Sequence, residues 1–144
     1  MWQAFAASAN CPELVALFDR LLAAPAPRSG PSALVHGDTK LSNLMWDEGK
    51  ISAMLDWEMA LNGDPLADLG YMLYGFESAH HGATTPQRQP GMPARGEVIA
   101  LWEQVSGRSA EGVFWHEIAQ IGKISAIIAE GANMHVTGRS QDPK

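Results

Sequence analysis

Two short apolar runs near the middle of the chain flank a turn sequence, and this arrangement constrains the fold more than any other feature. The runs are Leu44-Met45-Trp46 and 51–55, and the four residues between them, 47–50 (Asp-Glu-Gly-Lys), include a glycine. Such a pattern predicts a β-hairpin. Asn43 stands directly before the hairpin and Asp56 directly after it. We therefore expect these two side chains to lie side by side, where their oxygens could bind one ion.

The segment before the hairpin predicts a helix, a linker and a strand. Apolar residues at helical spacing between 14 and 22 indicate a helix, with Asn10 as its N-cap and Glu13 closing a capping box. Prolines and a glycine between 25 and 31 predict a linker. The apolar run 33–35 predicts a short strand that delivers His36 to a loop.

The segment after the hairpin is mainly helical in its pattern. Residues 61–65 predict a turn, with Asp64 as N-cap and Pro65 as the first residue of a helix through 73. A long surface loop is expected over 77–93, including His80 and His81, followed by helices over about 94–105 and 111–135. These elements predict an α+β, mainly helical fold in a single domain, residues 1–144.

Composition excludes several classes of function. The net charge of −6 argues against a nucleic-acid-binding surface, because binding to the phosphate backbone of a nucleic acid requires a basic stripe. No apolar run approaches 18 residues, so no membrane partner is predicted. Cys11 is the one cysteine, which excludes an internal disulfide and favours a reducing, cytoplasmic location.

Acidic side chains gather around one motif. Between residues 36 and 69 there are seven acids and two bases, which favours a site for cations. The run 36–43 reads His-Gly-Asp-Thr-Lys-Leu-Ser-Asn, and Asp56-Trp57-Glu58 follows thirteen residues later. Phosphoryl transfer requires positioning and charge compensation more than covalent chemistry. In this pattern Asp38 can take a proton from an acceptor hydroxyl, while Asn43 and Asp56 can hold Mg²⁺.

Five neighbouring residues are candidates for supporting roles. His36 is expected to brace the loop rather than to bind metal. Lys40 either faces the transferred phosphate or is a solvated charge, and Glu58 either binds a second ion or is an exposed acid. Asp64 is expected to cap a helix, and Asp68 to accept hydrogen bonds from amides of the loop.

These motifs resemble a known family. The stretches from Val35 to Asp38, from Leu55 to Glu58 and from Gly63 to Leu69 are similar to those of the aminoglycoside phosphotransferase (APH) and choline kinase family. Three further segments, 91–95, 106–108 and 127–131, resemble the subgroup found as the kinase part of acyl-CoA dehydrogenase fusion proteins.

The resemblance implies the C-terminal lobe of a protein-kinase-like fold, with ATP and Mg²⁺ as cofactors and a hydroxylated small molecule as acceptor. It implies Asp38 as catalytic base and Asn43 and Asp56 as metal ligands. Related members act on hydroxyacyl-CoA, choline, homoserine and other hydroxyl compounds.

Family members also carry an N-terminal nucleotide-binding lobe, and residues 1–35 contain no segment that resembles it. We therefore expect this chain to be part of a longer enzyme and to be inactive by itself. One alternative is a non-catalytic, kinase-like binding module that dimerises through the face which the absent lobe would cover. A metal-dependent hydrolase built on the acidic residues is a weaker alternative.

Overall fold

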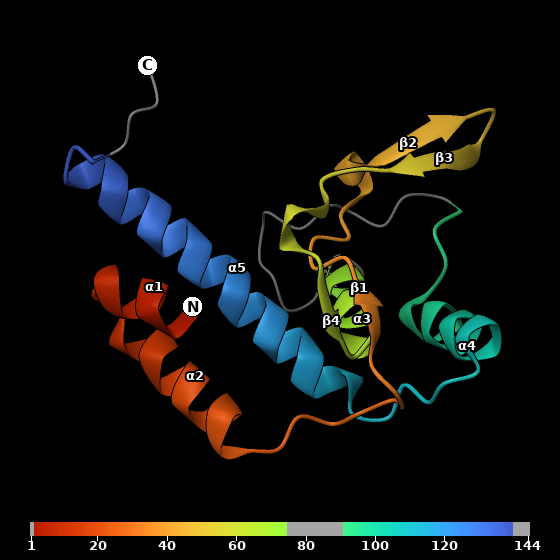
Figure 1. The fold of residues 1–144 in the computed structure, drawn as a ribbon, viewed down its shortest axis with the longest axis horizontal. Coiled ribbons are helices and arrows are strands. Elements are labelled where there is room, and N and C mark those ends of the chain that lie inside the picture. The colour runs from red at the N-terminus through yellow and green to blue at the C-terminus, as the bar shows by residue number, and fades with distance from the viewer. Residues whose placement is uncertain (1, 75–90, 140–144) are drawn as a thin grey trace. The chain divides into compact units, whose positions relative to one another are not determined.

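The computed structural model describes residues 2–74 and 91–139 (Figure 1). Two compact units are present, one formed by residues 1–26 and 118–144, the other by residues 27–117. The last helix, α5 (Val113–Val136), contributes to both. The prediction of a single domain stays a prediction. No described helix is long and apolar enough to cross a membrane.

The first unit contains α1 (Trp2–Ser8), α2 (Pro12–Ala23) and most of α5. Its buried core is small and consists of Ala6, Phe18 and Ala126, with partly buried apolar side chains around it. In α5, a Cβ on Gly122 would lie 3.0 Å from Leu17 Cδ2. Glycine is therefore accommodated inside this helix because it permits close packing against α2.

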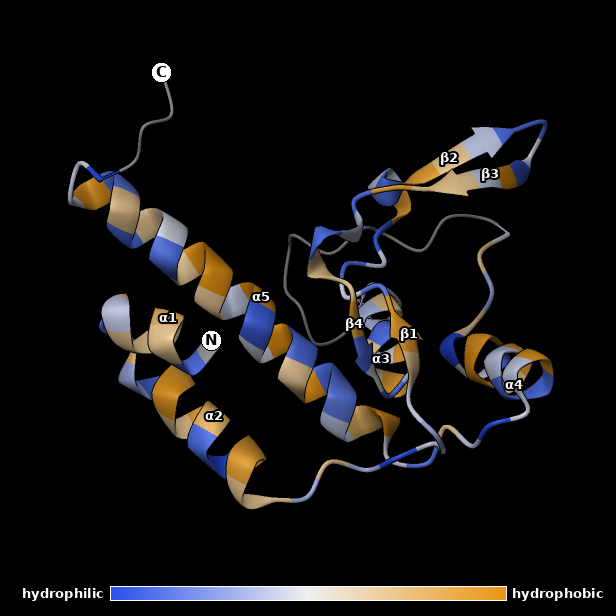
Figure 2. Cartoon of the chain, viewed as in Figure 1, coloured by the Kyte–Doolittle hydropathy of each residue, from blue (hydrophilic) through white to orange (hydrophobic). Residues whose placement is uncertain are grey.

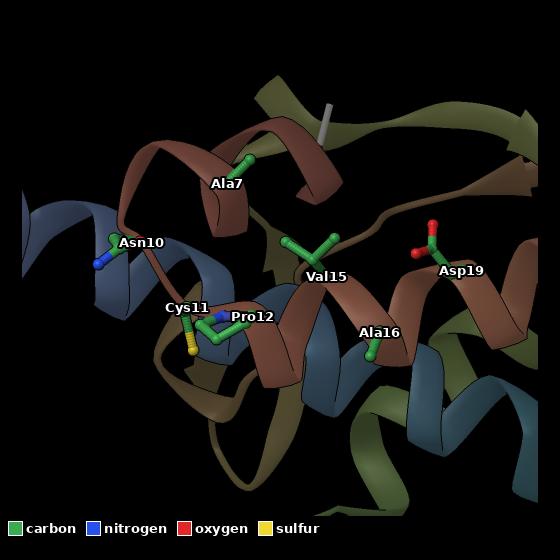
Figure 3. Close-up of a pocket in the computed structure, with 7 residues that line it drawn as sticks. All are labelled: Ala7, Asn10, Cys11, Pro12, Val15, Ala16 and Asp19. Carbon is green, nitrogen blue, oxygen red and sulfur yellow. The ribbon is translucent and has the colours of Figure 1, made fainter.

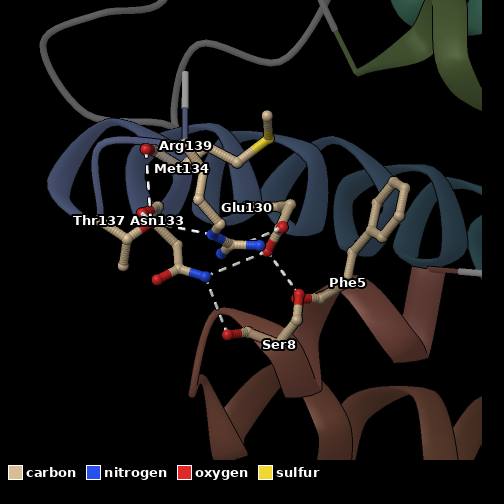
Figure 4. Close-up of polar contacts among 7 residues, drawn as sticks. All are labelled: Phe5, Ser8, Glu130, Asn133, Met134, Thr137 and Arg139. Atoms are coloured by element: carbon tan, nitrogen blue, oxygen red, sulfur yellow. Dashed lines mark hydrogen bonds and ion pairs between the residues drawn. The ribbon is translucent and has the colours of Figure 1, made fainter. Parts of the chain in front are cut away.

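A polar network also joins α1 to the end of α5 (Figure 4). The Glu130 carboxylate accepts hydrogen bonds from Ser8 Oγ and Asn133 Nδ2 and forms an ion pair with Arg139. Asn133 Nδ2 also donates to the Ser8 carbonyl at 2.9 Å. The hydrogen bond from Ser8 is the main reason why the pKa of Glu130 is lowered.

The second unit contains the remaining elements. They are β1 (Ala33–Val35), β2 (Leu44–Asp47), β3 (Lys50–Met54), β4 (Leu61–Gly63), α3 (Leu66–Leu73), α4 (Arg95–Ser106) and the first residues of α5. Among the described residues, the strands form two antiparallel pairs, β1 with β4 and β2 with β3. Figure 2 shows β1 as hydrophobic and the tip of the β2–β3 hairpin as hydrophilic.

Helix α3 carries the core of the second unit. Leu66, Leu69 and Leu73 are at most 2% exposed and pack with residues that precede or begin α5. The approach to α5 is close, because a Cβ on Gly70 would lie 2.8 Å from the Glu117 amide nitrogen. Glu117 is buried and is held by a two-pronged ion pair with Arg95 of α4.

The predicted hairpin is confirmed. Its turn is shorter than expected, because the strands extend to Asp47 and Lys50 and leave Glu48 and Gly49 between them. Both turn residues have positive φ (45° and 76°), as two-residue hairpin turns of this kind require. An irregularity between Met45 and Trp46 shifts the register by one residue.

Other expectations are corrected by the structure. Residues 61–63 form strand β4 rather than a turn, because the backbone of β1 needs hydrogen-bond partners and residues 61–63 supply them. Asn10 does not cap α2. It has φ of 55° and ends α1, where the Cys11 amide donates to the Ala6 carbonyl. Helix α1 itself was not predicted.

The remaining predicted elements are present or lie outside the described residues. The helices predicted over 65–73, 94–105 and 111–135 correspond to α3, α4 and α5. Most of the predicted loop 77–93, including His80 and His81, lies outside the described residues.

The core of the second unit provides a test of this packing. We expect Leu69→Ala to lower the free energy of unfolding by about 2–5 kcal/mol, because it leaves a cavity in the cluster around α3. Met72, on the same helix, is 43% exposed, and Met72→Ala should cost less than about 1 kcal/mol. Urea unfolding of both variants measures the difference, and equal losses would contradict this core.

Candidate functional site

The loop after β1 is attached to helix α3 by one carboxylate. Asp68 Oδ2 accepts the His36 amide at 2.7 Å, and Asp68 Oδ1 accepts the Gly37 amide at 2.8 Å. Thr39 Oγ1 adds a bond to the Asp68 carbonyl. Because His36 and Gly37 are buried, their amides would otherwise be left without partners. Asp68 thus makes the hydrogen bonds to loop amides that the sequence predicted.

His36 connects the loop to the end of the hairpin. Its ring Nδ1 accepts the Asp38 amide at 3.1 Å, which places the ring proton on Nε2, and Nε2 donates to the Leu55 carbonyl at 2.8 Å. The ring also lies 4.7 Å from that of Trp57. Both nitrogens are engaged and the residue is 2% exposed. This geometry suits a brace and leaves no nitrogen for a metal.

Gly37 is required by its surroundings. Its φ is 83°, and a Cβ there would lie 2.6 Å from the Met59 carbonyl oxygen. Both the backbone conformation and the space therefore exclude a larger residue.

Three side chains donate to the carboxylate of Asp38. Its Oδ1 accepts Tyr71 Oη at 2.7 Å, and its Oδ2 accepts Lys40 Nζ at 2.7 Å and Asn43 Nδ2 at 2.9 Å. Burial raises the pKa of Asp38, but the hydrogen bonds from Lys40, Tyr71 and Asn43 together outweigh burial and lower it. The carboxylate is therefore ionised at neutral pH and can accept a proton.

Lys40 lies among several acids. The hydrogen bond to Asp38 is the main reason why its pKa is raised, and the charges of Asp38, Asp56 and Glu58 act in the same direction. The negative charges of all three carboxylates thus stabilise the ammonium group of Lys40. Its side chain is 46% exposed, so the ammonium group is accessible to an anionic ligand.

The hairpin brings Asn43 next to the residue that precedes Asp56. The Leu55 amide donates to the Asn43 carbonyl at 2.8 Å, which continues the pairing of β2 with β3 by one step. Asp56 then adopts a left-handed conformation with φ of 65°. This strained backbone conformation of Asp56 persists because the preceding residue, Leu55, is held on both sides. Its amide donates to Asn43, and its carbonyl accepts from His36.

The donor set of Asn43 and Asp56 suits Mg²⁺. The side-chain nitrogen of Asn43 donates two hydrogen bonds, one to the Asp38 carbonyl and one to the Asp38 carboxylate. The amide oxygen is thereby left for a ligand, and Asp56 is exposed. Mg²⁺ typically binds one or two carboxylates together with substrate phosphates. The described residues contain no cluster of three or more His, Cys, Asp or Glu side chains that could hold a metal alone.

Asp64 and Glu58 have different surroundings. Asp64 accepts the Ser29 amide at 2.7 Å, Ser29 Oγ at 2.8 Å and the Leu66 amide at 3.0 Å. It therefore caps α3, since Pro65 already has helical backbone angles. Glu58 is exposed in the 3₁₀ turn Trp57–Met59.

Sequence reasoning missed Tyr71. The sequence predicts it only as part of the helix through 73, whereas its hydroxyl donates a hydrogen bond to Asp38. One signal was present: Tyr71 follows Asp68 by three residues, and positions i and i+3 share a helix face. A prediction that Asp68 contacts the loop could therefore have included Tyr71.

A pocket elsewhere contains none of these residues. It has a volume of about 310 Å³, lies in the first unit between α1 and α2 (Figure 3), and is lined by Ala7, Asn10, Cys11, Pro12, Val15, Ala16 and Asp19. This lining offers one carboxylate and no cluster of polar groups, so it does not suggest a catalytic site.

Comparison with known proteins identifies the family. Residues 2–109, well over half of the chain, match the family described as phosphotransferase enzyme family, APH. The chain belongs to the APH family. The matched range contains the whole loop, the hairpin and helix α3.

Similar proteins agree with this family. Mouse acyl-CoA dehydrogenase family member 10 is 45% identical over 47 residues, and chicken member 11 is 43% identical over 47 residues. Each match covers 31% of this chain but only 4% and 6% of those relatives. Mouse member 11 is 32% identical over 77 residues, which is 48% of this chain and 10% of that protein. These matches agree with the resemblance to acyl-CoA dehydrogenase fusion proteins that the sequence predicts.

A solved structure shows the same fold. The crystal structure named "putative aminoglycoside phosphotransferase" from Ralstonia eutropha matches with a TM-score of 0.80 at 24% identity. The match covers 98% of this chain and 46% of that one. The predicted α+β, kinase-like fold is confirmed. The APH chain described here thus spans less than half the length of this structural relative.

The Asp68 contacts lead to a stability prediction. We expect Asp68→Asn to lower the free energy of unfolding by about 1–3 kcal/mol, because an amide presents only one acceptor oxygen to the two buried loop amides. Asp47→Asn, at the exposed end of β2, is the matched control and should change stability by less than about 0.5 kcal/mol. Urea unfolding compares them, and an unaffected Asp68→Asn protein would contradict the proposed anchor.

Proposed function

We propose that the protein containing this chain transfers the γ-phosphoryl group of ATP to a hydroxyl group of a small molecule. The observation that carries this proposal is the position of the Asp38 carboxylate, which Tyr71 and Asn43 hold by hydrogen bonds beside the hairpin. The APH family and the kinase-like fold support a phosphotransferase. ATP, Mg²⁺ and the hydroxylated acceptor belong to the proposal.

Asp38 is the proposed catalytic base. As the acceptor oxygen bonds to the γ-phosphorus and the bond to ADP breaks, the hydroxyl proton passes to the Asp38 carboxylate. A carboxylate has about four lone-pair positions. The described side chains of Tyr71, Lys40 and Asn43 use three of them. One position is left for the acceptor hydroxyl.

Asn43 and Asp56 are the proposed metal ligands. Bound Mg²⁺ would neutralise charge on the phosphates of the nucleotide. Lys40 is placed to add a further positive charge, because its ammonium is accessible and lies within the influence of all three acids. His36, Asp64 and Asp68 hold the backbone around these groups.

The acceptor is proposed only as a class. Related members of the family act on different hydroxyl compounds, and a fold does not determine a substrate. A panel of choline, homoserine, a hydroxyacyl-CoA and an aminoglycoside, each with ATP and Mg²⁺, covers the chemistry that the family suggests. We further propose a cytoplasmic location, which the lone Cys11 supports.

A non-catalytic module that dimerises is the second candidate. It is favoured by the exposed apolar side chains of the β2–β3 hairpin, where Met45, Trp46 and Ile51 are each more than half exposed. A protein that sediments as a dimer and transfers no phosphate from ATP to any member of the panel would support this second hypothesis over the first.

Substitution of Asp38 tests the proposed enzyme. We expect Asp38→Asn in the complete protein to lower turnover by about 10²–10⁴-fold, the usual contribution of a general base, while ATP binding persists. Phosphate transfer from labelled ATP to the panel measures turnover, and calorimetry measures ATP binding. Asp47→Asn, on the exposed hairpin, is the control and should retain wild-type turnover. Wild-type turnover by Asp38→Asn would overturn the assignment of the base.

A further inference from the structure

We propose that Tyr71 is a positioning residue for Asp38 and that it directs Oδ1 of this carboxylate toward the acceptor hydroxyl. The inference rests on the proposed function and extends it, because it names which oxygen takes the proton and which side chain orients that oxygen.

Tyr71 extends from a rigid element. Its helix, α3, is fixed through Leu66, Leu69 and Leu73, which are at most 2% exposed. Asp68, one turn earlier, holds the amides of the loop, and Tyr71 reaches the side chain of Asp38 in the same loop. One helix face therefore fixes both the backbone and the carboxylate. Sites on well-packed helices are positioned more accurately than sites on loops alone.

The two oxygens of Asp38 have different surroundings. Among the described side chains, Lys40 and Asn43 both donate to Oδ2, whereas Tyr71 alone donates to Oδ1. Each carboxylate oxygen has about two lone-pair positions. Oδ2 is therefore saturated by its two donors, and Oδ1 retains one position. A hydroxyl that approaches Asp38 would find its acceptor at Oδ1, beside the Tyr71 hydroxyl.

The phenol is suited to remain a donor. Burial, followed by the hydrogen bond to Asp38, raises the pKa of Tyr71, so the hydroxyl keeps its proton at every pH at which the enzyme would work. Tyr71 therefore does not compete for the acceptor proton.

Removal of the hydroxyl tests the inference. Tyr71→Phe removes the one described side-chain donor to Oδ1 of Asp38. We expect kcat to fall by about 10-fold, with KM for ATP unchanged, because only the orientation of the base is lost. Asp47→Asn, at the exposed end of β2, is the control and should match the wild type.

A further measurement keeps the outcomes separate. Asp38→Asn is assayed in parallel with ATP and the same acceptor panel. If Asp38→Asn is inactive while Tyr71→Phe keeps the wild-type kcat, the inference about Tyr71 is wrong and the proposed function stands. If Asp38→Asn is fully active, the assignment of the base fails and the inference about Tyr71 fails with it. A wild-type protein that transfers no phosphate to any member of the panel would overturn the proposed function.

Discussion

The anchoring of the loop after β1 by the Asp68 carboxylate is the interaction on which the site depends. Asp68 holds two consecutive buried amides, and it extends from a helix whose other face forms the core of its unit. The loop is thus fixed to a helix that carries the core of its unit. Without this contact, His36 and Gly37 would lose the partners that set the direction in which Asp38 points. The packing of α3 in the core therefore determines where the Asp38 carboxylate lies.

The second constraint is the link between the loop and the hairpin. His36 joins the Asp38 amide to the Leu55 carbonyl, and Asn43 joins the Asp38 side chain to the Leu55 amide. Two independent connections therefore lead from Asp38 to the residue before Asp56. They explain how Asp56, although exposed, keeps a left-handed backbone conformation at a fixed position relative to Asp38.

The sequence predicts the parts of this site that depend on local pattern. The hairpin, the helix over 65–73 and the contacts of Asp68 all follow from turn chemistry, periodicity and short-range hydrogen bonding. Strand β4 was missed because Asn62-Gly63 is typical of a turn, whereas the outcome depends on pairing with a distant strand. Helix α1 was missed because its stability comes from packing of Ala6 against Phe18 and Ala126, which no local pattern reveals. The contact of Tyr71 with Asp38 likewise joins residues 33 positions apart.

The central claim is that Asn43 and Asp56 lie together and hold a divalent metal with the nucleotide. The most direct measurement is paramagnetic broadening by Mn²⁺ in the presence of a non-hydrolysable ATP analogue, observed by NMR in the complete protein. We predict that the side-chain signals of Asn43 and Asp56 broaden first and together, while those of Asp47 at the hairpin tip persist. Broadening at Asp47 with no effect on Asn43 and Asp56 would contradict the account.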